Sequence, residues 1–359
     1  MVLTTERALS MSARLLVSIG AGLAARGDRV VFAPLRNSDV DRFLARRFPK
    51  LPAHAITARG GIAGVLAVRK IAQAAGADAI LVGCERDQLT AALAIGREGG
   101  VVRRLAIGER FVLNWRTKLA ASRSNCLLMG DQVGTDVHED THVRAAVAWP
   151  RPAMLVSGDG SRATSAGSPS ILAVVAGDSR VPAQHAAGAA ALRAAARLLT
   201  RHAGLRVQLL GDMSAMQALR LHAASVGLTE QVDVVPLDAL IEPGPFNASA
   251  VWVTSAGDAG GVSVVSAMMR RIPVIVPQGF DTESLVASRI TGFVSDDTDL
   301  AGSVAALAHV LADADAHQAM GAAAASRAER AHGWDAYLHT VQSTLARVAG
   351  KTANRHSAA

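Results

Sequence analysis

The stretch from Ser255 to Pro277 places small residues and turn formers in an order that could hold an anion. After its opening β-branched run, Gly260 and Gly261 allow the backbone to approach a ligand closely. A helix expected from about Val262 would direct the N–H groups of its first turn, and the positive end of its dipole, toward that ligand. Ser263 adds a hydroxyl group. The pattern predicts a phosphate-binding loop, and the alternative is a strand-to-helix turn in which glycine serves geometry alone.

The elements around this stretch alternate along the whole chain. Short β-branched runs follow longer Ala- and Leu-rich segments of helical period, which is typical of βα units around a parallel sheet. In the first half we expect strands at 29–34, 53–57, 79–83, 101–107, 125–129 and 153–157, and helices at about 5–25, 38–47, 62–75, 87–97, 112–121 and 131–146. In the second half we expect strands at 171–177, 206–211, 232–236, 250–255, 273–277 and 292–295, and helices at 186–202, 214–226, 262–270, 282–288, 299–312 and 315–349.

A loop rich in Gly, Ser and Thr separates the two halves at residues 158–170 and is expected to be a linker. Each half is predicted to be an α/β domain of the Rossmann-like type, with a cleft between the two. Ligands of such sheets bind outside the carboxyl ends of the strands. This organisation suits a two-domain enzyme or binding protein and does not choose a chemistry.

The distribution of charge and the content of aromatic residues and cysteine limit the possible classes of protein. Residues 1–150 contain 21 Lys and Arg against 13 Asp and Glu, whereas the remainder contains 16 against 17. The basic half could meet anionic lipid, a phosphorylated substrate or nucleic acid, or could simply aid solubility. Dispersed arginines and an aromatic content of 3% argue against nucleic acid. Two cysteines and the lack of a long apolar run predict a cytoplasmic protein without a disulfide framework.

The segment from Asp258 to Val276, D-A-G-G-V-S-V-V-S-A-M-M-R-R-I-P-V-I-V, resembles the donor-site motif of retaining GT-B glycosyltransferases of family 4 (glycosyl transferases group 1). In that family the loop is roughly E-G-F-G-L-x-x-x-E-A-M-A-x-G-x-P-V-V-A, and the spacing matches without a gap. Asp258 aligns with the first Glu, which faces the sugar. Ser266 aligns with the second, which contacts the ribose, and is a neutral and weaker partner than a carboxylate.

The same resemblance extends over most of the chain and is strongest from 171 to 345. The segment 171–185 is similar to the first strand and loop of the donor domain, where the family has an Arg and a Lys that neutralise the diphosphate. Asp178 stands at the Arg position, and Arg180 is a substitute that could reach a phosphate. Leu237, after the strand at 232–236, is expected to line the base pocket.

The resemblance implies a GT-B fold whose C-terminal helix crosses back to the first domain. We expect an acceptor domain at 1–157 whose first strand is missing, because residues 1–3 are too few to form one; either the first βα unit is lost or the recorded start lies downstream of the real one. The remaining parts expected are the linker at 158–170, a donor domain at 171–330, a crossover helix at 331–349 and a frayed tail at 350–359.

The resemblance also implies a function: transfer of a sugar from a nucleotide-sugar to an acceptor, with retention and without a metal or other cofactor. The acceptor would be a carbohydrate, a lipid-linked compound or another small molecule. The basic first domain could contact the inner face of a membrane peripherally. Two alternatives stay open: a degenerate relative that binds ligands or partners without turnover, and a sugar-nucleotide epimerase on the same fold.

Other candidate sites have weaker support in the sequence. His138 and His142 are spaced as a helical metal pair, but no third ligand is evident, and a solvated helix face explains them. The Gly20-x-Gly22 segment lacks the third glycine of a dinucleotide-binding fingerprint. Cys84 ends a strand and is more simply a buried structural thiol than a nucleophile.

Overall fold

Two parallel sheets organise the chain, and each forms the centre of one compact unit in the computed structural model. The first unit comprises Met1–Pro150 together with Asp335–Ala359, and the second comprises Arg151–Trp334. The residues that the structure describes are 1–106, 109, 114–130, 144–148, 170–178, 180–242, 244–296 and 298–356. The predicted strand at 153–157, all but the last residue of the linker predicted at 158–170, and most of the predicted helix at 131–146 lie outside these ranges.

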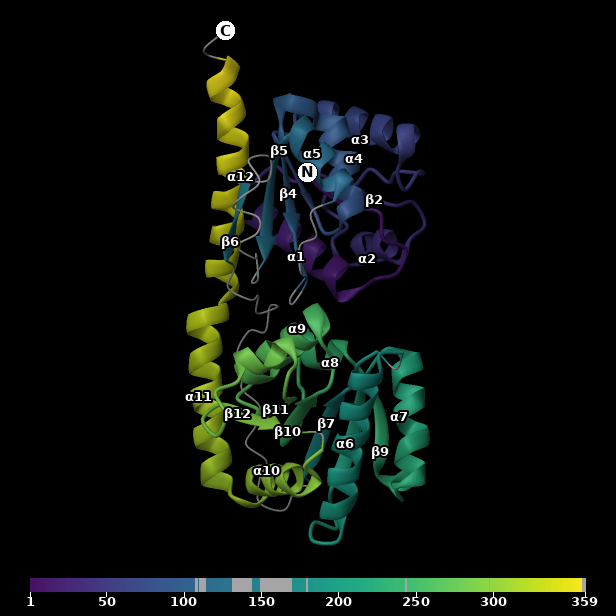
Figure 1. The fold of residues 1–359 in the computed structure, drawn as a ribbon, viewed down its shortest axis with the longest axis vertical. Helices are drawn as coiled ribbons and strands as arrows, with labels where there is room; N and C mark the ends of the chain where they lie inside the picture. Colours follow the sequence, from purple (N-terminus) through teal and green to yellow (C-terminus); the bar gives the residue numbers. More distant parts are fainter. Residues whose placement is uncertain are drawn as a thin grey trace. The chain divides into compact units, whose positions relative to one another are not determined.

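The first sheet has the strand order β2-β1-β3-β4-β5-β6, with all pairs parallel (Figure 1). Its strands are β1 (Val2–Thr4), β2 (Phe32–Pro34), β3 (Ala79–Val82), β4 (Gly100–Arg104), β5 (Asn125–Gly130) and β6 (Arg144–Ala148). β1 corrects the prediction that the first strand is missing. Three residues suffice because β1 pairs with β2 on one edge and β3 on the other, and Leu3 is fully buried.

Helices cover both faces of this sheet. α3 (Gly61–Ala75), α4 (Glu85–Ile95) and α5 (Trp115–Arg123) pack on one face, where Val68, Ala92 and Ala120 share an apolar cluster with Leu3 and Val101. The opposite face receives α1 (Met11–Ala25) and α12 (Trp334–His356). α2 (Asp39–Arg47) and the short 3₁₀ helix η1 (Gly96–Glu98) complete the helices described in this unit.

The second sheet has the order β12-β11-β10-β7-β8-β9 and is also parallel throughout. Its strands are β7 (Ile171–Val175), β8 (Arg206–Gly211), β9 (Val232–Pro236), β10 (Ala250–Val253), β11 (Val274–Pro277) and β12 (Gly292–Ser295). These strands agree closely with the sequence prediction, because each is a short β-branched run between two helices.

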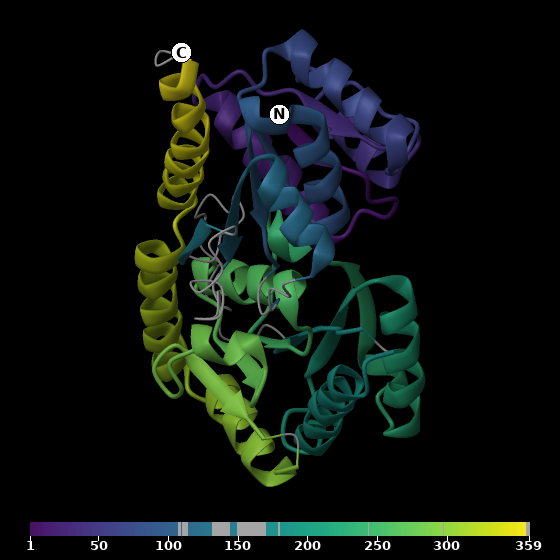
Figure 2. The same ribbon diagram turned by 45° about the horizontal axis from the view of Figure 1, so that its top comes forward.

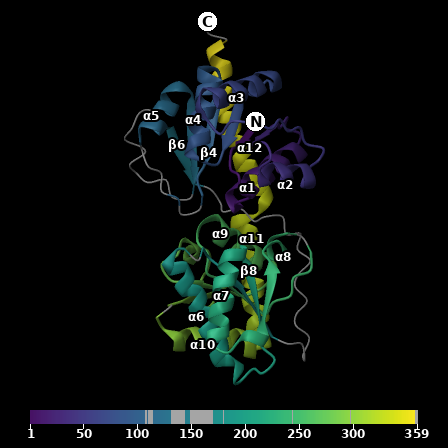
Figure 3. The same cartoon turned by 90° about the vertical axis from the view of Figure 1, so that its right-hand side faces the viewer.

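One face of the second sheet is covered by α6 (Pro182–Leu199), α7 (Met213–Ser225) and α10 (Leu300–Ala312), which Figure 3 shows together. Trp252 of β10 is fully buried in the apolar cluster beneath them. The other layer contains α9 (Gly257–Met269), flanked by α8 (Asp238–Ile241) and α11 (Ala314–His332). Short 3₁₀ helices lie at η3 (Thr229–Gln231) and η4 (Asp281–Leu285), the latter where a helix at 282–288 was expected.

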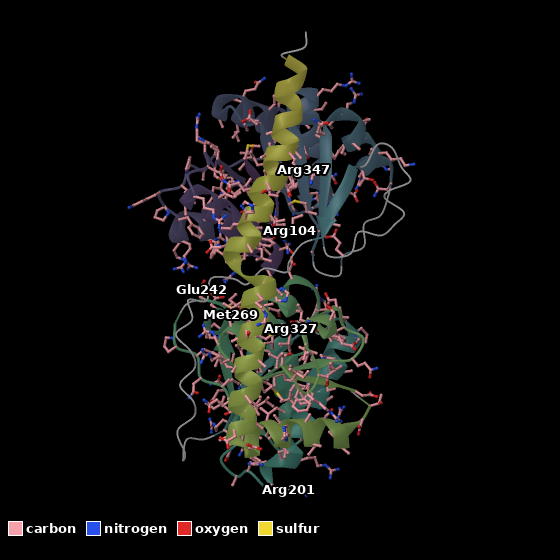
Figure 4. All side chains as sticks on the ribbon, turned by 90° about the vertical axis from the view of Figure 1, so that its left-hand side faces the viewer. Arg104, Arg201, Glu242, Met269, Arg327 and Arg347 are labelled. Carbon is pink, nitrogen blue, oxygen red and sulfur yellow. The ribbon has the colours of Figure 1, made fainter. Side chains whose placement is uncertain are left out.

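The C-terminal helix crosses back to the first unit, as the resemblance implied. The single helix expected at 315–349 is two helices, α11 and α12, which break at Gly333 (Figure 2). Arg104 lies beside α12 in Figure 4, and its Nε donates to the Tyr337 hydroxyl at 3.3 Å. α12 continues to His356, into the segment predicted as a frayed tail, which corrects that prediction.

Two smaller expectations also change. The run at 53–57 forms only isolated bridges at Ala53 and Ile56 instead of a strand, and β6 occupies 144–148, where the end of a helix was expected. Among the described residues, no helix combines the length and hydropathy needed to cross a bilayer.

Candidate functional site

The strand order of the second sheet reverses between β7 and β10. The helix after β7 lies on one face of the sheet, and the helix after β10 lies on the other. In open parallel sheets, ligands bind at the carboxyl ends of the two strands where the order reverses. Arg180 follows β7 and Asp258 follows β10, so the fold brings together the two loops that the sequence indicated.

The two loops contact each other directly. The Gly177 N–H donates to Thr254 Oγ1 at 3.3 Å, and this hydroxyl in turn donates to the Val175 carbonyl at 2.8 Å. A Cβ on Gly177 would lie 2.4 Å from the Thr254 carbonyl oxygen. Only glycine therefore permits the loops to approach this closely.

The first loop holds a charged pair. Arg180 Nε donates to Asp178 Oδ1 at 3.0 Å, and its Nη2 donates to Oδ2 at 2.8 Å. The Arg180 side chain is 88% exposed. Hydrogen bonds from Arg180 lower the pKa of the Asp178 carboxyl to about 2. A phosphate near this loop would thus meet an ion pair, because Asp178 already engages the cation predicted to bind it.

Helix α9 begins at Gly257, before the glycine pair, and the prediction of a start near Val262 is wrong. Gly260 N donates to the Ala256 carbonyl at 3.3 Å, so this N–H belongs to the helix and is not free. Ala256 offers no capping side chain, but Asp281 Oδ2 accepts from Gly257 N at 2.9 Å. A carboxylate of η4 stabilises the early helix start, and it stands where a phosphate was expected.

Gly260 has a packing role that the sequence did not show. A Cβ at this position would lie 2.1 Å from the Ser255 carbonyl oxygen and 2.8 Å from Thr282 Cγ2. The residue therefore lets α9 approach the end of β10 and η4. This packing gives a structural reason for a glycine at position 260, beside the ligand-binding role expected from the sequence.

The other predicted donor residues on α9 are buried. Gly261 and Val262 lie inside the helix layer, and Asp258 in the first turn is 4% exposed. Ser263 Oγ donates to the Ala259 carbonyl at 2.7 Å, one turn earlier.

Ser266 is fully buried, and its Oγ makes no hydrogen bond within the described chain. In this structure Ser266 offers no exposed surface to a ligand.

Leu237 lies half-buried at the start of α8, in a segment held by a residue that the sequence analysis missed. Arg270 is buried at the end of α9 and donates to the carbonyls of Leu240 at 3.0 Å, Gly244 at 2.8 Å and Glu242 at 2.6 Å. Burial lowers the pKa of its guanidinium. The Arg270-Arg271 pair before β11 was visible in the sequence, but nothing distinguished the buried arginine from its neighbour.

The reversal point of the first sheet falls between β1 and β3 and is also polar. The Thr5 N–H and hydroxyl donate to the buried Asp87 carboxylate at 2.9 Å and 2.6 Å. Burial raises the pKa of Asp87, and burial together with Asp87 raises the pKa of the Cys84 thiol to about 12. Cys84 is thus a neutral thiol, and it is half-buried where the sequence predicted a buried one.

Glu109 follows the next strand, β4. Glu109 Oε1 accepts from Arg103 Nη2 at 2.6 Å, and Oε2 accepts from the Ala106 N–H at 2.8 Å. Arg110, His138 and His142 lie outside the described residues. Within the described ranges, no three His, Cys, Asp or Glu side chains are arranged to hold a metal ion.

Comparison with solved structures identifies the fold. A glycosyltransferase from Rickettsia africae ESF-5 superposes with a TM-score of 0.73 at 11% identity, covering 97% of this chain and 98% of the other. Anabaena HepE in complex with UDP and glucose gives 0.70 at 14% identity, covering 96% and 98%. Sucrose-phosphate synthase from Thermosynechococcus elongatus gives 0.68 at 13% identity, also covering 96% and 98%. The chain has the GT-B fold.

A match to a family model identifies the related family. Residues 185–327 match the family described as Glycosyl transferases group 1, and this segment contains α9 and most of the second sheet. The resemblance to GT-B glycosyltransferases of this family, predicted from the donor-site spacing, is thereby confirmed. A search of curated protein sequences gives no significant match.

Proposed function

We propose that the protein is a glycosyltransferase that takes a sugar from a nucleoside diphosphate sugar and passes it to an acceptor with retention. The observation that carries the proposal is the start of α9 at the reversal point of the second sheet, within the segment that matches the group 1 family. The Anabaena neighbour, solved with UDP-glucose and with UDP and glucose, supports a nucleotide-sugar as the class of donor.

In this proposal the leaving diphosphate binds at the first turn of α9, whose backbone amides and dipole stabilise the negative charge that develops there. The diphosphate would replace Asp281 Oδ2 on the Gly257 N–H. Arg180, which is exposed, would turn from Asp178 to a phosphate oxygen. Asp258 would orient the sugar. No metal ion or other cofactor takes part.

The remaining donor contacts follow the resemblance. Ser266 would bind the ribose and Leu237 would line the base pocket. Ser266 would have to become accessible first, because its side chain is fully buried. Leu237 belongs to the segment that Arg270 fixes through backbone carbonyls, which gives the base pocket a rigid wall.

A second candidate, a binding protein without turnover, is favoured by the same contacts. The Asp281 carboxylate accepts a hydrogen bond from the Gly257 N–H at the start of α9, and Asp178 accepts hydrogen bonds from Arg180 of the neighbouring loop. Both contacts compete with a diphosphate for the groups that would bind it. The hydroxyl at the ribose position is buried as well.

Melting temperature measured against UDP, GDP and ADP tests the proposal, because a ligand of the folded state raises it by mass action. We expect a concentration-dependent rise with at least one nucleotide, and sugar transfer or donor hydrolysis with the matching nucleotide-sugar. No rise with any nucleotide contradicts the transferase. Binding without turnover supports the second.

Asp258→Asn separates catalysis from folding. This variant should lose transfer while it keeps its melting temperature within a few degrees. Asp315→Asn is the matched control, because Asp315 lies in the first turn of α11 and is exposed. Equal activity in the two variants would remove Asp258 from the site.

A further inference from the structure

A pocket of about 370 Å³ lies at the reversal point of the first sheet. Thr5 follows β1, Cys84 follows β3, and both line the pocket. Three arginines from different segments complete it: Arg59 precedes α3, Arg86 lies in the first turn of α4, and Arg116 lies in the first turn of α5. Reversal points are where ligands of open α/β sheets bind.

The three guanidinium groups are only partly engaged. Arg59 Nε donates to the Thr5 carbonyl at 3.0 Å, which holds its stem against β1. Arg116 is 54% exposed and lies 5.3 Å from the Trp115 ring centroid. Arg86 is exposed, and its side chain makes no hydrogen bond or ion pair with the described residues.

Two carboxylates, those of Glu6 and Glu85, line the pocket beside the three arginines. Glu6 Oε2 accepts from Ser10 Oγ at 2.5 Å. Glu85 accepts from Asn114 Nδ2 at 2.9 Å and lies 3.7 Å from Arg116 Nη1. The Cys84 thiol adds no charge, because burial, followed by Asp87, raises its pKa to about 12. The lining therefore carries a positive excess.

The floor of the pocket is rigid. The buried Asp87 carboxylate accepts both the N–H and the hydroxyl of Thr5, at 2.9 Å and 2.6 Å. These bonds tie the end of β1 to the first turn of α4, where Arg86 lies. A ligand would thus meet cations on a preorganised frame, which lowers the entropy lost on binding.

We propose that this pocket binds a phosphate group of the acceptor through Arg59, Arg86 and Arg116. The inference rests on the proposed transferase function and names the chemical class of its acceptor. Guanidinium groups match phosphate oxygens in geometry and charge. The lining of this pocket carries more cations than carboxylates, whereas the second sheet offers a balanced ion pair at its reversal point.

Exposed apolar side chains flank the arginines. Ile62, in the first turn of α3, is 82% exposed, and Trp115, which begins α5, is 66% exposed. The phosphate could belong to a lipid headgroup or to a free phosphate ester, and the two sources call for separate arms of one experiment.

The full-length protein is titrated with glycerol 3-phosphate in one arm. The other arm uses phosphatidylcholine vesicles containing about 30% phosphatidic acid. Arg86→Gln and Arg59→Gln should each weaken binding by about three- to tenfold, the range of one charge-assisted phosphate contact. Arg123→Gln, at the other end of the helix that carries Arg116, is the matched control and should bind as the parent does. Weaker binding of either probe by Arg86→Gln and Arg59→Gln supports the pocket. The probe that the parent binds more tightly identifies the source of the phosphate.

No binding of either probe to the parent chain, or an equal loss in Arg123→Gln, overturns the proposal. UDP binding measured on the same variants keeps the two proposals apart. An unchanged UDP affinity with lost phosphate binding supports a separate pocket on the first unit. If the parent binds UDP and transfers sugar but binds neither phosphate probe, only the pocket proposal is overturned. If the parent binds a phosphate probe but not UDP, the pocket proposal stands and the donor proposal is contradicted.

Discussion

Both sheets have a point at which the strand order reverses, but different residues lie at the two points. In each, the strand order reverses between the first strand of the unit and a later one, at β1 and β3 in the first sheet and at β7 and β10 in the second. The first reversal point gathers arginine side chains around a pocket. The second gathers glycines, buried hydroxyls and the first turn of α9, and its exposed arginine is paired with Asp178.

The glycines explain much of this difference. Gly83 follows β3, and a Cβ there would have Leu16 Cδ2 as its nearest neighbour, at 3.6 Å, an ordinary contact. Gly177 follows β7, where a Cβ would lie 2.4 Å from a backbone oxygen. At the second reversal point, backbone packs against backbone at Gly177 and Gly260, which leaves less room there for side chains. The first leaves room for side chains, so its chemistry comes from long cations.

The largest expected effect is at Ser266. Ser266→Glu would place a carboxylate at a fully buried position, and urea unfolding should show a loss of about 4 kcal/mol. Ser266→Ala is the control and should be neutral or slightly stabilising, because the serine hydroxyl has no partner among the described residues. If Ser266→Glu instead keeps its stability and binds nucleotide more tightly, this position is accessible, and the contrast between the units is smaller than the structure indicates.

A smaller loss is expected from one methyl group at the same reversal point. Gly260→Ala would force a Cβ to within 2.1 Å of a backbone oxygen and should reduce the free energy of unfolding by about 3 kcal/mol. Gly83→Ala, at the reversal point of the first sheet, should change it by less than about 0.5 kcal/mol. Similar losses in the two variants would show that both units pack their strand ends equally tightly.

The smallest effect concerns the charged pair. Asp178→Asn removes the partner of Arg180 and should tighten nucleoside diphosphate binding by about three- to fivefold at low salt, as expected for an exposed pair. Asp233→Asn is the control, because it breaks a similar exposed pair with Arg206 on the same sheet, away from the reversal point. Equal affinities in calorimetry for Asp178→Asn and the parent would exclude competition by Asp178.

Most of the fold could be predicted from the sequence, because parallel strands buried on both faces are short β-branched runs. β8, β9 and β12 have the predicted bounds. β1 was missed because three residues carry almost no pattern, and pairing on both edges stabilises them. The start of α9 was missed because Asp281, which caps it, is distant in sequence. The break at Gly333 lies in a helical pattern that continues on both sides.

The sequence by itself determined the alternation of strands and helices, the linear spacing from Asp258 to Ser266 and the basic first half. These depend on local residue types and their periods. Only the tertiary structure decided what those residues meet: Asp281 on the Gly257 N–H, Asp178 on Arg180, and three arginines around one pocket. Such contacts join residues from different loops, and their distances are fixed by strand order and helix packing, which no local pattern encodes.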